Sequence, residues 1–491
     1  MPSRPCVFVS CPVMTLYNNT LIPVMQDSYR DSPALGVYLL VAHLRRKGYQ
    51  CDVFDWVAAP HISLEEVIQE LLHYEVIFFS ANSLNWAVIR TLAKKVKENN
   101  PGIKTCIGGP HATYYPQSVM VSECFDGLFR GEADNYIHLV YETLRSGETL
   151  KPGKENTIPG FSLCKGSVKN GTGVKNGAGI KNDIGVKNGA GAKNGTIPQV
   201  VQEHDLTTFD WHPAYDLIPA SQYCTMPVET SRGCRNSCTF CSIIGKNSWR
   251  SYSAKVALEQ LVHALPYCEK TRFKKLNIVD NTFTTDHRRI IDICKALSED
   301  SFRHRLTYDA ALVDLQDLEL IEALEPFTSD LLVGAEVSSE GEAKKIHKAV
   351  SPELIKQAAL HLQKFNLSQR AVFSFIIGFP WHTTEDCLRT FDFITNLILD
   401  YGVRVYLQWY WAIPGSAIWS KLEQERKISL EVVNTPGFFQ SSEWFYAIRN
   451  MRPEDVWAVD ERIRPVQMLL TLGHGSQVRR PFEYAPPFVR S

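Results

Sequence analysis

The sequence lacks any long run of apolar residues. Its longest apolar stretches, such as Ala371 to Pro380, are far shorter than the roughly 20 residues that a membrane-spanning helix needs. The N-terminus also lacks the long apolar region and the small-residue cleavage site of a signal peptide. We therefore expect a cytoplasmic protein without a transmembrane segment.

The sequence also lacks an excess of charge of either sign. Its 52 Lys and Arg residues nearly balance its 53 Asp and Glu residues, which leaves a formal net charge of −1. Without a global basic field the chain has little with which to hold nucleic acid or an anionic membrane. The charge balance therefore argues against nucleic acid as a partner and favours a small-molecule or peptide substrate. No paired carboxylates and no nucleophile–base set are evident either.

Cysteine, in contrast, is plentiful, with 13 residues. The cytosol keeps thiols reduced, so disulfides are not expected to explain them. Most are scattered singly, as small buried hydrophobes are. Only Cys234, Cys238 and Cys241 are clustered, and these three need a chemical explanation.

The 491 residues are too many for one ordinary core and predict two or three domains. Residues 1–150 alternate strand and helix, which predicts an α/β, doubly wound, Rossmann-like domain with a parallel sheet. Helices are expected at 34–48, 63–72, 86–99 and 134–144. Strands are expected at Cys6–Val9, Cys51–Trp56, Val76–Ser80, Ile103–Ile107 and Gly127–Phe129.

Residues 151–205 are predicted to form a linker. Within it, residues 168–195 repeat a six-residue phrase, VKNGAG with close variants. Asn-Gly favours turns, and the phrase has little bulk to bury. A β-solenoid also uses six-residue repeats, but so many glycines favour a flexible loop.

Residues 206–425 form a second α/β region. Six β/α units in a row predict a partial (β/α)6 barrel. Ser351 is expected to start one of its helices, and Thr383 with Asp386 resembles the capping box of another. Residues 426–491 are expected to form a small helical cap with an irregular tail. The six barrel strands are expected at 227–231, 275–280, 306–310, 331–336, 371–377 and 403–411.

The clustered cysteines have the spacing C-x3-C-x2-C and follow directly on the first of these strands. Three thiolates on one loop can hold three corners of a four-iron, four-sulfur cubane. The fourth iron then has no protein ligand, and an open coordination site is typical of catalysis. The alternatives are a structural zinc ion, with His204 or His212 as the fourth ligand, and three unrelated cysteines.

On these residues the chain resembles the radical S-adenosylmethionine (SAM) superfamily. The resemblance implies that the [4Fe-4S] cluster binds the amino and carboxylate groups of SAM at its open iron. An electron donor such as flavodoxin or ferredoxin then drives cleavage to methionine and a 5′-deoxyadenosyl radical. It also implies that Phe240, inside the motif, lies near the adenine, although core packing explains a phenylalanine equally well.

Further residues fit the same resemblance. Asp280 and Asn281 end the second barrel strand, where the family often binds the methionine moiety, although the usual Gly-Gly-Glu is absent. Glu336 ends the fourth strand, where a carboxylate can accept hydrogen bonds from the ribose. The phrases at 377–380 and 412–416 resemble two others that shape the cavity of the family's barrel.

The N-terminal domain resembles the cobalamin-binding domain that precedes the barrel in many members of this superfamily. The resemblance rests on Gly108, Gly109 and His111 after the fourth strand, and on Gly131 and Glu132 after the fifth. Glycines at such an edge allow the backbone to approach a bulky ligand closely. The Asp-x-His-x-x-Gly phrase that supplies a histidine to cobalt elsewhere is absent, which leaves His111 as the one candidate exception. The alternative is a remnant domain without cobalamin.

The two domains together predict a cobalamin-dependent methyltransferase acting on an unactivated carbon of a natural product, lipid or peptide. In the implied scheme the cofactors supply the hard chemistry and the barrel orients the substrate. Alternating aromatic residues on the sixth strand, at 406–411, either line a substrate pocket or pack under the cap.

Two other functions stay open. One is a radical cyclase or rearrangement enzyme with the same cofactors, and the other is a non-catalytic iron–sulfur sensor or scaffold. A methylthiotransferase is less favoured, because the N-terminal cysteines lack the pattern of a second three-cysteine cluster.

Overall fold

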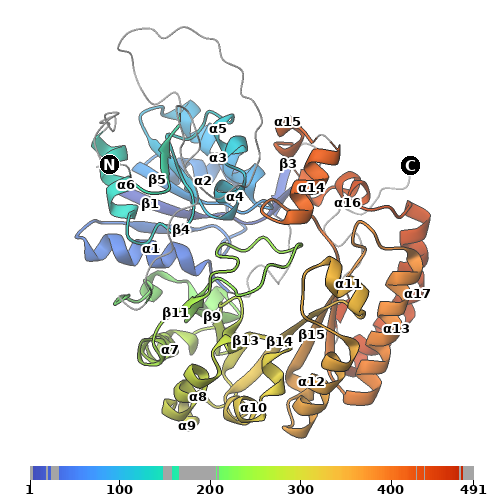
Figure 1. The fold of residues 1–491 in the computed structure, drawn as a ribbon. Coiled ribbons are helices and arrows are strands. Elements are labelled where there is room, and N and C mark those ends of the chain that lie inside the picture. The colour runs from blue at the N-terminus through green and yellow to red at the C-terminus, as the bar shows by residue number, and fades with distance from the viewer. Residues whose placement is uncertain are drawn as a thin grey trace, which may run out of the picture.

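The computed structural model describes residues 4–17, 20–23, 32–146, 158–164, 206, 209–426, 428–435, 437–474 and 477–478. The repeats at 168–195 and His204 lie outside this part of the chain. Figure 1 shows the N-terminal α/β domain, in blue and teal, above a second α/β unit in green to orange. The predicted fold class is confirmed, and no helix in the described ranges is both long enough and apolar enough to span a bilayer.

The N-terminal domain is built on a six-stranded sheet. All five predicted strands are present and parallel, and β8 adds an antiparallel edge beside β7 that the sequence analysis missed. With only three residues, β8 is too short to show a periodicity. The strands follow the order β4 (Asp52–Asp55), β1 (Arg4–Ser10), β5 (Tyr74–Ser80), β6 (Lys104–Gly108), β7 (Gly127–Phe129) and β8 (Phe161–Leu163).

Helices cover both faces of this sheet. On one face α1 (Leu35–Arg46) contacts α6 (Ile137–Ser146), and on the other α2 (Leu64–Leu71) contacts α3 (Trp86–Asn99). Ser63 starts α2 where expected, because its side chain and that of Glu66 form a capping box. The strand order reverses between β1 and β5, which places the ligand-binding edge of such a sheet at their carboxyl ends.

The second unit is an open, all-parallel sheet of seven strands. Its two edge strands, β9 and β17, do not pair, so the barrel is partial, as predicted. The predicted helix starts at Ser351 and Thr383 are confirmed by side-chain caps. The strands are β9 (Thr225–Val228), β12 (Lys275–Ile278), β13 (Leu306–Ala311), β14 (Thr328–Glu336), β15 (Ala371–Ile377), β16 (Arg404–Trp409) and β17 (Gln477–Val478).

Helices between these strands cover the outside of the sheet. They include α7 (Ala254–Cys268), α8 (His287–Ala296), α10 (Leu318–Leu324), α12 (Pro352–Lys364) and α13 (Thr384–Tyr401). The helix α14 (Ala417–Arg426) follows β16 and instead contacts the N-terminal domain, where Glu423 accepts a bond from the Tyr115 hydroxyl. The two shorter helices α9 (Glu299–Phe302) and α11 (Glu340–Lys345) follow α8 and β14.

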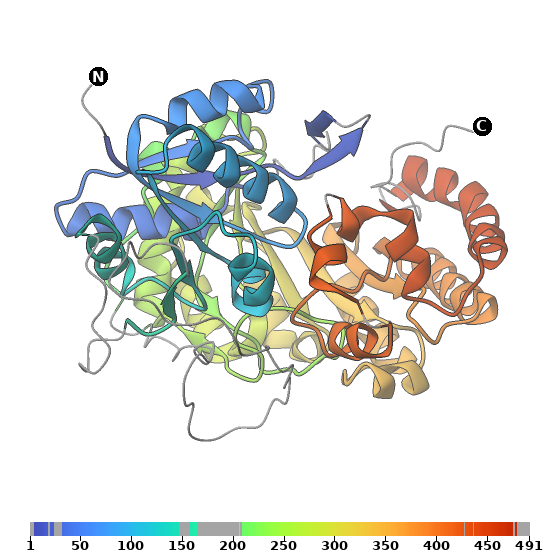
Figure 2. The ribbon, with the colours of Figure 1, turned by 90° about the horizontal axis from the view of Figure 1, so that it is seen from above.

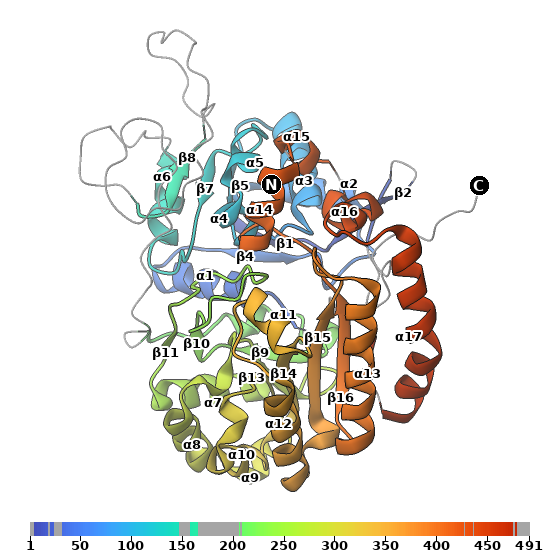
Figure 3. The same cartoon turned by 45° about the vertical axis from the view of Figure 1, so that its right-hand side comes forward.

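The C-terminal region is helical, as expected, but it also extends the barrel sheet. The helices α15 (Leu430–Val433) and α16 (Ser442–Ala447) lie beside the N-terminal domain in Figure 2. The helix α17 (Pro453–His474) packs along α13 (Figure 3) and returns the chain so that β17 pairs with β16. A two-residue strand carries no sequence signal, so β17 was not expected.

Side chains alternate between the two faces of the barrel strands. On β13, Tyr308 is buried under the outer helices, whereas Asp309 is exposed on the inner face. On β16 the aromatic Trp409 packs outward against Phe445 of α16, and Tyr406 lies on the inner face. Two of the aromatic residues considered for a substrate pocket thus lie on opposite faces: Tyr406 faces the inside of the barrel, and Trp409 faces the outside.

Candidate active site

The cysteine loop, residues 231–251, follows β9 and lies between the two units (Figure 1). A short antiparallel hairpin of β10 (Ser231–Arg232) and β11 (Arg250–Ser251) closes its base. Because the loop leaves the carboxyl end of a barrel strand, it lies at the barrel mouth, where barrel enzymes place their chemistry.

Two glycines give the cysteine loop its tight fold. Gly233 has a φ of +77°, and a Cβ built on it would lie 1.8 Å from the Ser248 carbonyl oxygen. The amide of the next residue, Cys234, donates to the Gly245 carbonyl at 3.1 Å. A side chain at position 233 would therefore force the two arms of the loop apart.

The three cysteines share this one loop, as the motif requires. Cys234 and Cys238 are buried, and Cys241 is partly exposed. Burial raises the pKa of both Cys238 and Cys241. Metal ligation requires the thiolate form, so metal binding and loss of the thiol protons are coupled at these cysteines.

The zinc alternative needs a fourth protein ligand beside the three thiols. In the described part of the chain, no three His, Cys, Asp or Glu side chains converge closely enough to hold one metal ion. His212, a considered zinc ligand, instead has Nδ1 3.0 Å from Gln260 Oε1 and stacks on His263.

Asp280 anchors the cysteine loop. Its fully buried carboxylate accepts bonds from the Thr230 amide at 2.7 Å, the Thr230 hydroxyl at 2.6 Å and the Ser231 hydroxyl at 2.6 Å. These bonds tie the carboxyl end of β12 to the start of the cysteine loop, and contact of Asp280 with the methionine moiety stays a prediction. Its neighbour Asn281 is exposed and donates to the Gly233 carbonyl at 3.4 Å.

Glu336 occupies an unusual backbone position. Its φ is +66°, and it follows a β-bulge between β14 and β15. Such backbone strain in a residue other than glycine often marks a functional position. Its Oε1 accepts a bond from Lys348 Nζ at 3.0 Å, and its Oε2 accepts one from the Ser374 hydroxyl at 3.5 Å.

Lys348 is the site residue that the sequence analysis missed. Burial alone would lower the pKa of Lys348, but the Glu336 carboxylate and the nearby thiols of Cys238 and Cys234 raise it. The ammonium group therefore stays charged between the cysteine loop and Glu336. A lysine just after a short helix carries no local signal of this role.

Phe240 contacts an aromatic group at the barrel mouth. Its ring lies edge-on to Phe379, at 6.1 Å between centroids, and Phe379 stacks on Trp381 and Tyr410. Glu342 accepts a bond from Trp381 Nε1 at 2.6 Å and so holds this group in place. The packing is compatible with both roles predicted for Phe240.

Asp309 is a second residue that the sequence did not reveal. It faces the barrel interior from the middle of β13, and among the described residues no hydrogen-bond partner approaches its carboxyl group. Burial among protein atoms, followed by the Glu336 and Asp280 carboxylates, raises the pKa of Asp309 to about 7. An unpaired acid in the interior is a candidate contact for substrate.

Asp309→Asn should stabilise the fold at alkaline pH. The folded pKa of about 7 exceeds the ordinary carboxyl value, so folding favours the proton, and stability is lost as pH rises from about 4 through 7. The variant should therefore melt at a higher temperature than the parent at about pH 8, with a smaller gain at about pH 4. A gain that does not grow with pH would contradict the elevated pKa.

The predicted glycines of the N-terminal domain lie at the carboxyl edge of its sheet. Gly109 has a φ of +91°, and a Cβ there would lie 2.7 Å from the Ala81 carbonyl oxygen. Gly108 ends β6, and Gly131, with a φ of +87°, donates its amide to the Thr113 hydroxyl at 3.0 Å. The backbone here is open to close approach, as a corrin-binding edge requires.

His111 is fully buried under this edge. Its Nε2 lies 2.7 Å from the Ser118 hydroxyl and its Nδ1 lies 3.2 Å from the Ser83 hydroxyl. The ring also stacks on Trp86, and burial lowers the pKa of His111 to about 3. Both ring nitrogens thus lie beside serine hydroxyls of the same domain, an arrangement that suits a residue holding the loop better than a ligand of cobalt.

Glu132 faces the barrel. Its carboxylate pairs with Arg250 at 2.6 Å and with Arg232 at 3.4 Å, both in the hairpin of the cysteine loop. The hydroxyl of Tyr114, in α4 (Pro110–Tyr114), donates to the Ile243 carbonyl of the same loop. The ligand edge of one domain is thus tied directly to the cysteine loop of the other.

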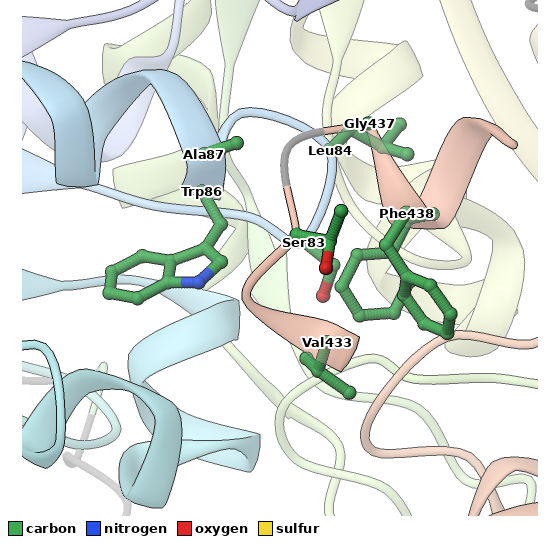
Figure 4. Close-up of a pocket in the computed structure, with 9 residues that line it drawn as sticks. Ser83, Leu84, Trp86, Ala87, Val433, Gly437 and Phe438 are labelled. Atoms are coloured by element: carbon green, nitrogen blue, oxygen red, sulfur yellow. The ribbon is translucent and has the colours of Figure 1, made fainter. Parts of the chain in front are cut away.

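A small hollow separates this edge from the C-terminal region (Figure 4). Ser83 and Leu84 line it from the N-terminal domain, and Val433 and Phe438 line it from α15 and the turn that follows. Trp86 Nε1 donates to the Asn434 side chain at 2.8 Å beside it. The C-terminal region therefore covers part of the same edge.

Two family models match the chain, one for each domain. The B12-binding domain model matches residues 22–139, and the Radical SAM superfamily model matches residues 228–394. The chain is 26% identical over 399 residues to an uncharacterized methyltransferase of Pyrococcus horikoshii, covering 79% of this chain and 78% of the relative. It is 21% identical to the anaerobic magnesium-protoporphyrin IX monomethyl ester cyclase of Rubrivivax gelatinosus, covering 73% of this chain and 61% of that enzyme.

Solved structures share the fold. The cobalamin-dependent SAM radical enzyme OxsB superposes with a TM-score of 0.63 at 15% identity, over 87% of this chain. The chain spans 62% of OxsB, less than two thirds of that protein. The radical SAM methyltransferase TsrM of Kitasatospora setae superposes with a TM-score of 0.59 at 11% identity, over 86% of this chain and 76% of TsrM.

Proposed function

Because this chain is a radical SAM enzyme that carries a B12-binding domain, we propose that it is a cobalamin-dependent methyltransferase acting on an unactivated carbon. Its substrate is a small natural product, a lipid or a peptide that enters the barrel. When bound, the cluster supplies the electron that cleaves SAM, and the cobalamin supplies the methyl group.

One observation carries this proposal. The ligand edge of the B12-binding domain and the cysteine loop of the barrel contact each other directly, through Tyr114 and Ile243 and through Glu132 and Arg250. Methyl transfer to a substrate radical requires both cofactors to reach one substrate position. Two binding sites that share a contact supply that proximity.

The proposed roles of the chain's own residues follow from their positions. Cys234, Cys238 and Cys241 hold the cluster. Lys348 is charged and lies beside the cysteine loop, and it pairs with the carboxylate of SAM. Glu336 accepts a hydrogen bond from a ribose hydroxyl of SAM. The loop glycines of the B12-binding domain, Gly108, Gly109 and Gly131, face the corrin.

Lys348→Met should weaken SAM binding without removing the cluster. Loss of a hydrogen-bonded charge costs roughly 1.5–3 kcal/mol, so the dissociation constant should rise about tenfold or more. Lys344→Met is the matched control, because Lys344 is exposed on α11. Equilibrium binding to the reconstituted chain measures both variants, and equal affinities would remove Lys348 from the site.

Product analysis tests the reaction class. The anaerobically reconstituted chain is incubated with SAM, methylcobalamin, a reductant and candidate substrates. Methyl transfer predicts both 5′-deoxyadenosine and S-adenosylhomocysteine, together with a product heavier by one methylene group. Deoxyadenosine without S-adenosylhomocysteine would favour a cyclase or rearrangement enzyme, and the absence of both would favour a sensor.

A further inference from the structure

Two arginines stand directly opposite each other at the base of the cysteine loop. Arg232 on β10 pairs in register with Arg250 on β11, in a hairpin of two residues per strand. Both side chains are largely buried, at 12% and 17% exposure. Like charges in directly opposed positions destabilise a strand pair, so this hairpin needs acids to hold it closed.

Two of those acids come from the B12-binding domain. Both carboxylate oxygens of Asp134 accept a hydrogen bond from the Arg232 guanidinium, at 2.8 Å each. Glu132 accepts two bonds from Arg250, at 2.6 and 3.1 Å. The barrel itself supplies Glu229, whose Oε1 lies 2.8 Å from Arg232 Nε.

The pKa of Glu132 agrees with strong pairing between this carboxylate and the two arginines. Burial opposes the shift of Glu132, yet Arg250 and Arg232 lower the pKa of Glu132. In a buried pair, removing one partner leaves an uncompensated charge, which is strongly destabilising. The acids of one domain therefore hold the arginines of the other.

Glu132 and Asp134 also lie at the sheet edge where a bound cofactor would contact their loop. Both follow β7 directly, in the loop that begins with Gly131 at the ligand edge of the B12-binding domain. Arg232 lies two positions before Cys234, the first cluster cysteine. A single buried ion network thus joins the corrin edge to the cluster loop.

We propose that Glu132 and Asp134 are positioning residues through which the B12-binding domain sets the conformation of the cluster-binding loop. This inference rests on the proposed function for the identity of the cluster. It predicts that a corrin bound at the edge alters the environment of the cluster through this network.

Asp134→Asn in the full chain tests the proposal by hydrogen exchange and by the electron paramagnetic resonance spectrum of the reduced cluster. Amides of residues 231–251 should exchange at least about tenfold faster, and the spectrum should change in shape. Asp210→Asn is the matched control, because Asp210 also forms an ion pair between the two units, with Arg46, but its side chain is 68% exposed and does not pair with the hairpin arginines. Glu132→Gln should also speed exchange and change the spectrum, but by less, since Arg232 still pairs with Asp134 and Glu229. This variant replaces Asp134→Asn in the test if Asp134→Asn does not fold.

Exchange is measured before reconstitution, so it does not depend on the cluster. A wild-type chain that binds no cluster would refute the proposed function while leaving the exchange result intact. Unchanged exchange and an unchanged spectrum in Asp134→Asn, or the same changes in Asp210→Asn, would overturn the positioning role. In the wild type, added hydroxocobalamin should shift the spectrum, and that shift should be lost in Asp134→Asn.

Discussion

Replacing Cys238 with alanine should abolish the reductive cleavage of SAM in the anaerobically reconstituted chain. Three thiolates from one loop are the whole protein ligand set of the proposed cluster, so none is redundant. With two ligands the cubane is either lost or degraded, and the electron has no route to the sulfonium of SAM. Cys234→Ala and Cys241→Ala should have the same effect. The measurements are iron and sulfide content and the yield of 5′-deoxyadenosine.

The control for these variants is another buried cysteine. Cys294 is 6% exposed in α8, on the outside of the barrel. Cys294→Ala removes a buried thiol without touching the loop, so it should keep both the cluster and the cleavage of SAM. If any of the three loop variants retained cleavage, the assignment of the cluster ligands would be wrong.

Gly233→Ala should prevent assembly of the cluster, although it adds only one methyl group. The new Cβ would lie 1.8 Å from the Ser248 carbonyl oxygen and 2.7 Å from the Gly245 carbonyl oxygen. Both are backbone atoms, which cannot swing aside as a flexible side chain can. The left-handed φ adds a cost of roughly 1–2 kcal/mol for any residue with a Cβ. The loop must open to admit the methyl group, and the three thiols then lose their common geometry.

We expect iron incorporation in Gly233→Ala to fall at least about tenfold, with the far-ultraviolet circular dichroism of the chain unchanged. Gly36→Ala is the matched control, since a Cβ on Gly36 in α1 meets no atom within 4 Å. In an exposed helix this change should stabilise the chain by up to about 1 kcal/mol. Normal iron content in Gly233→Ala would mean that the loop adopts another conformation when the cluster is bound.

Much of the fold could be predicted from the sequence, because the sequence signals of helices and strands are local. The buried strand β15 was predicted at its true bounds, since a largely apolar run of seven residues is typical of a buried strand in a parallel sheet. The start of α13 followed from Thr383 and Asp386, three residues apart. The strands β8 and β17 were missed, because two or three residues are placed only by the partners they meet.

The candidate site was harder to predict from the sequence, because its charged side chains pair with residues that are far away in the chain. Asp280 was expected to face a ligand, but it accepts bonds from Thr230 and Ser231, about fifty positions earlier. Glu132 was expected at the corrin, but it pairs with Arg250, 118 residues later. Which donor an acid meets depends on how the domains dock, and no local pattern encodes that.

The sequence by itself determined the chemistry and the order of the parts. The C-x3-C-x2-C spacing lies within one loop, and the alternation of strands and helices within each domain is equally local, so both are read directly from the chain. Only the tertiary structure decided which residues serve that chemistry. It brought Lys348 to Glu336 and joined Asp134 to Arg232, because buried charges are partnered only when separate elements pack together. It also decided that Asp309 faces the inside of the barrel.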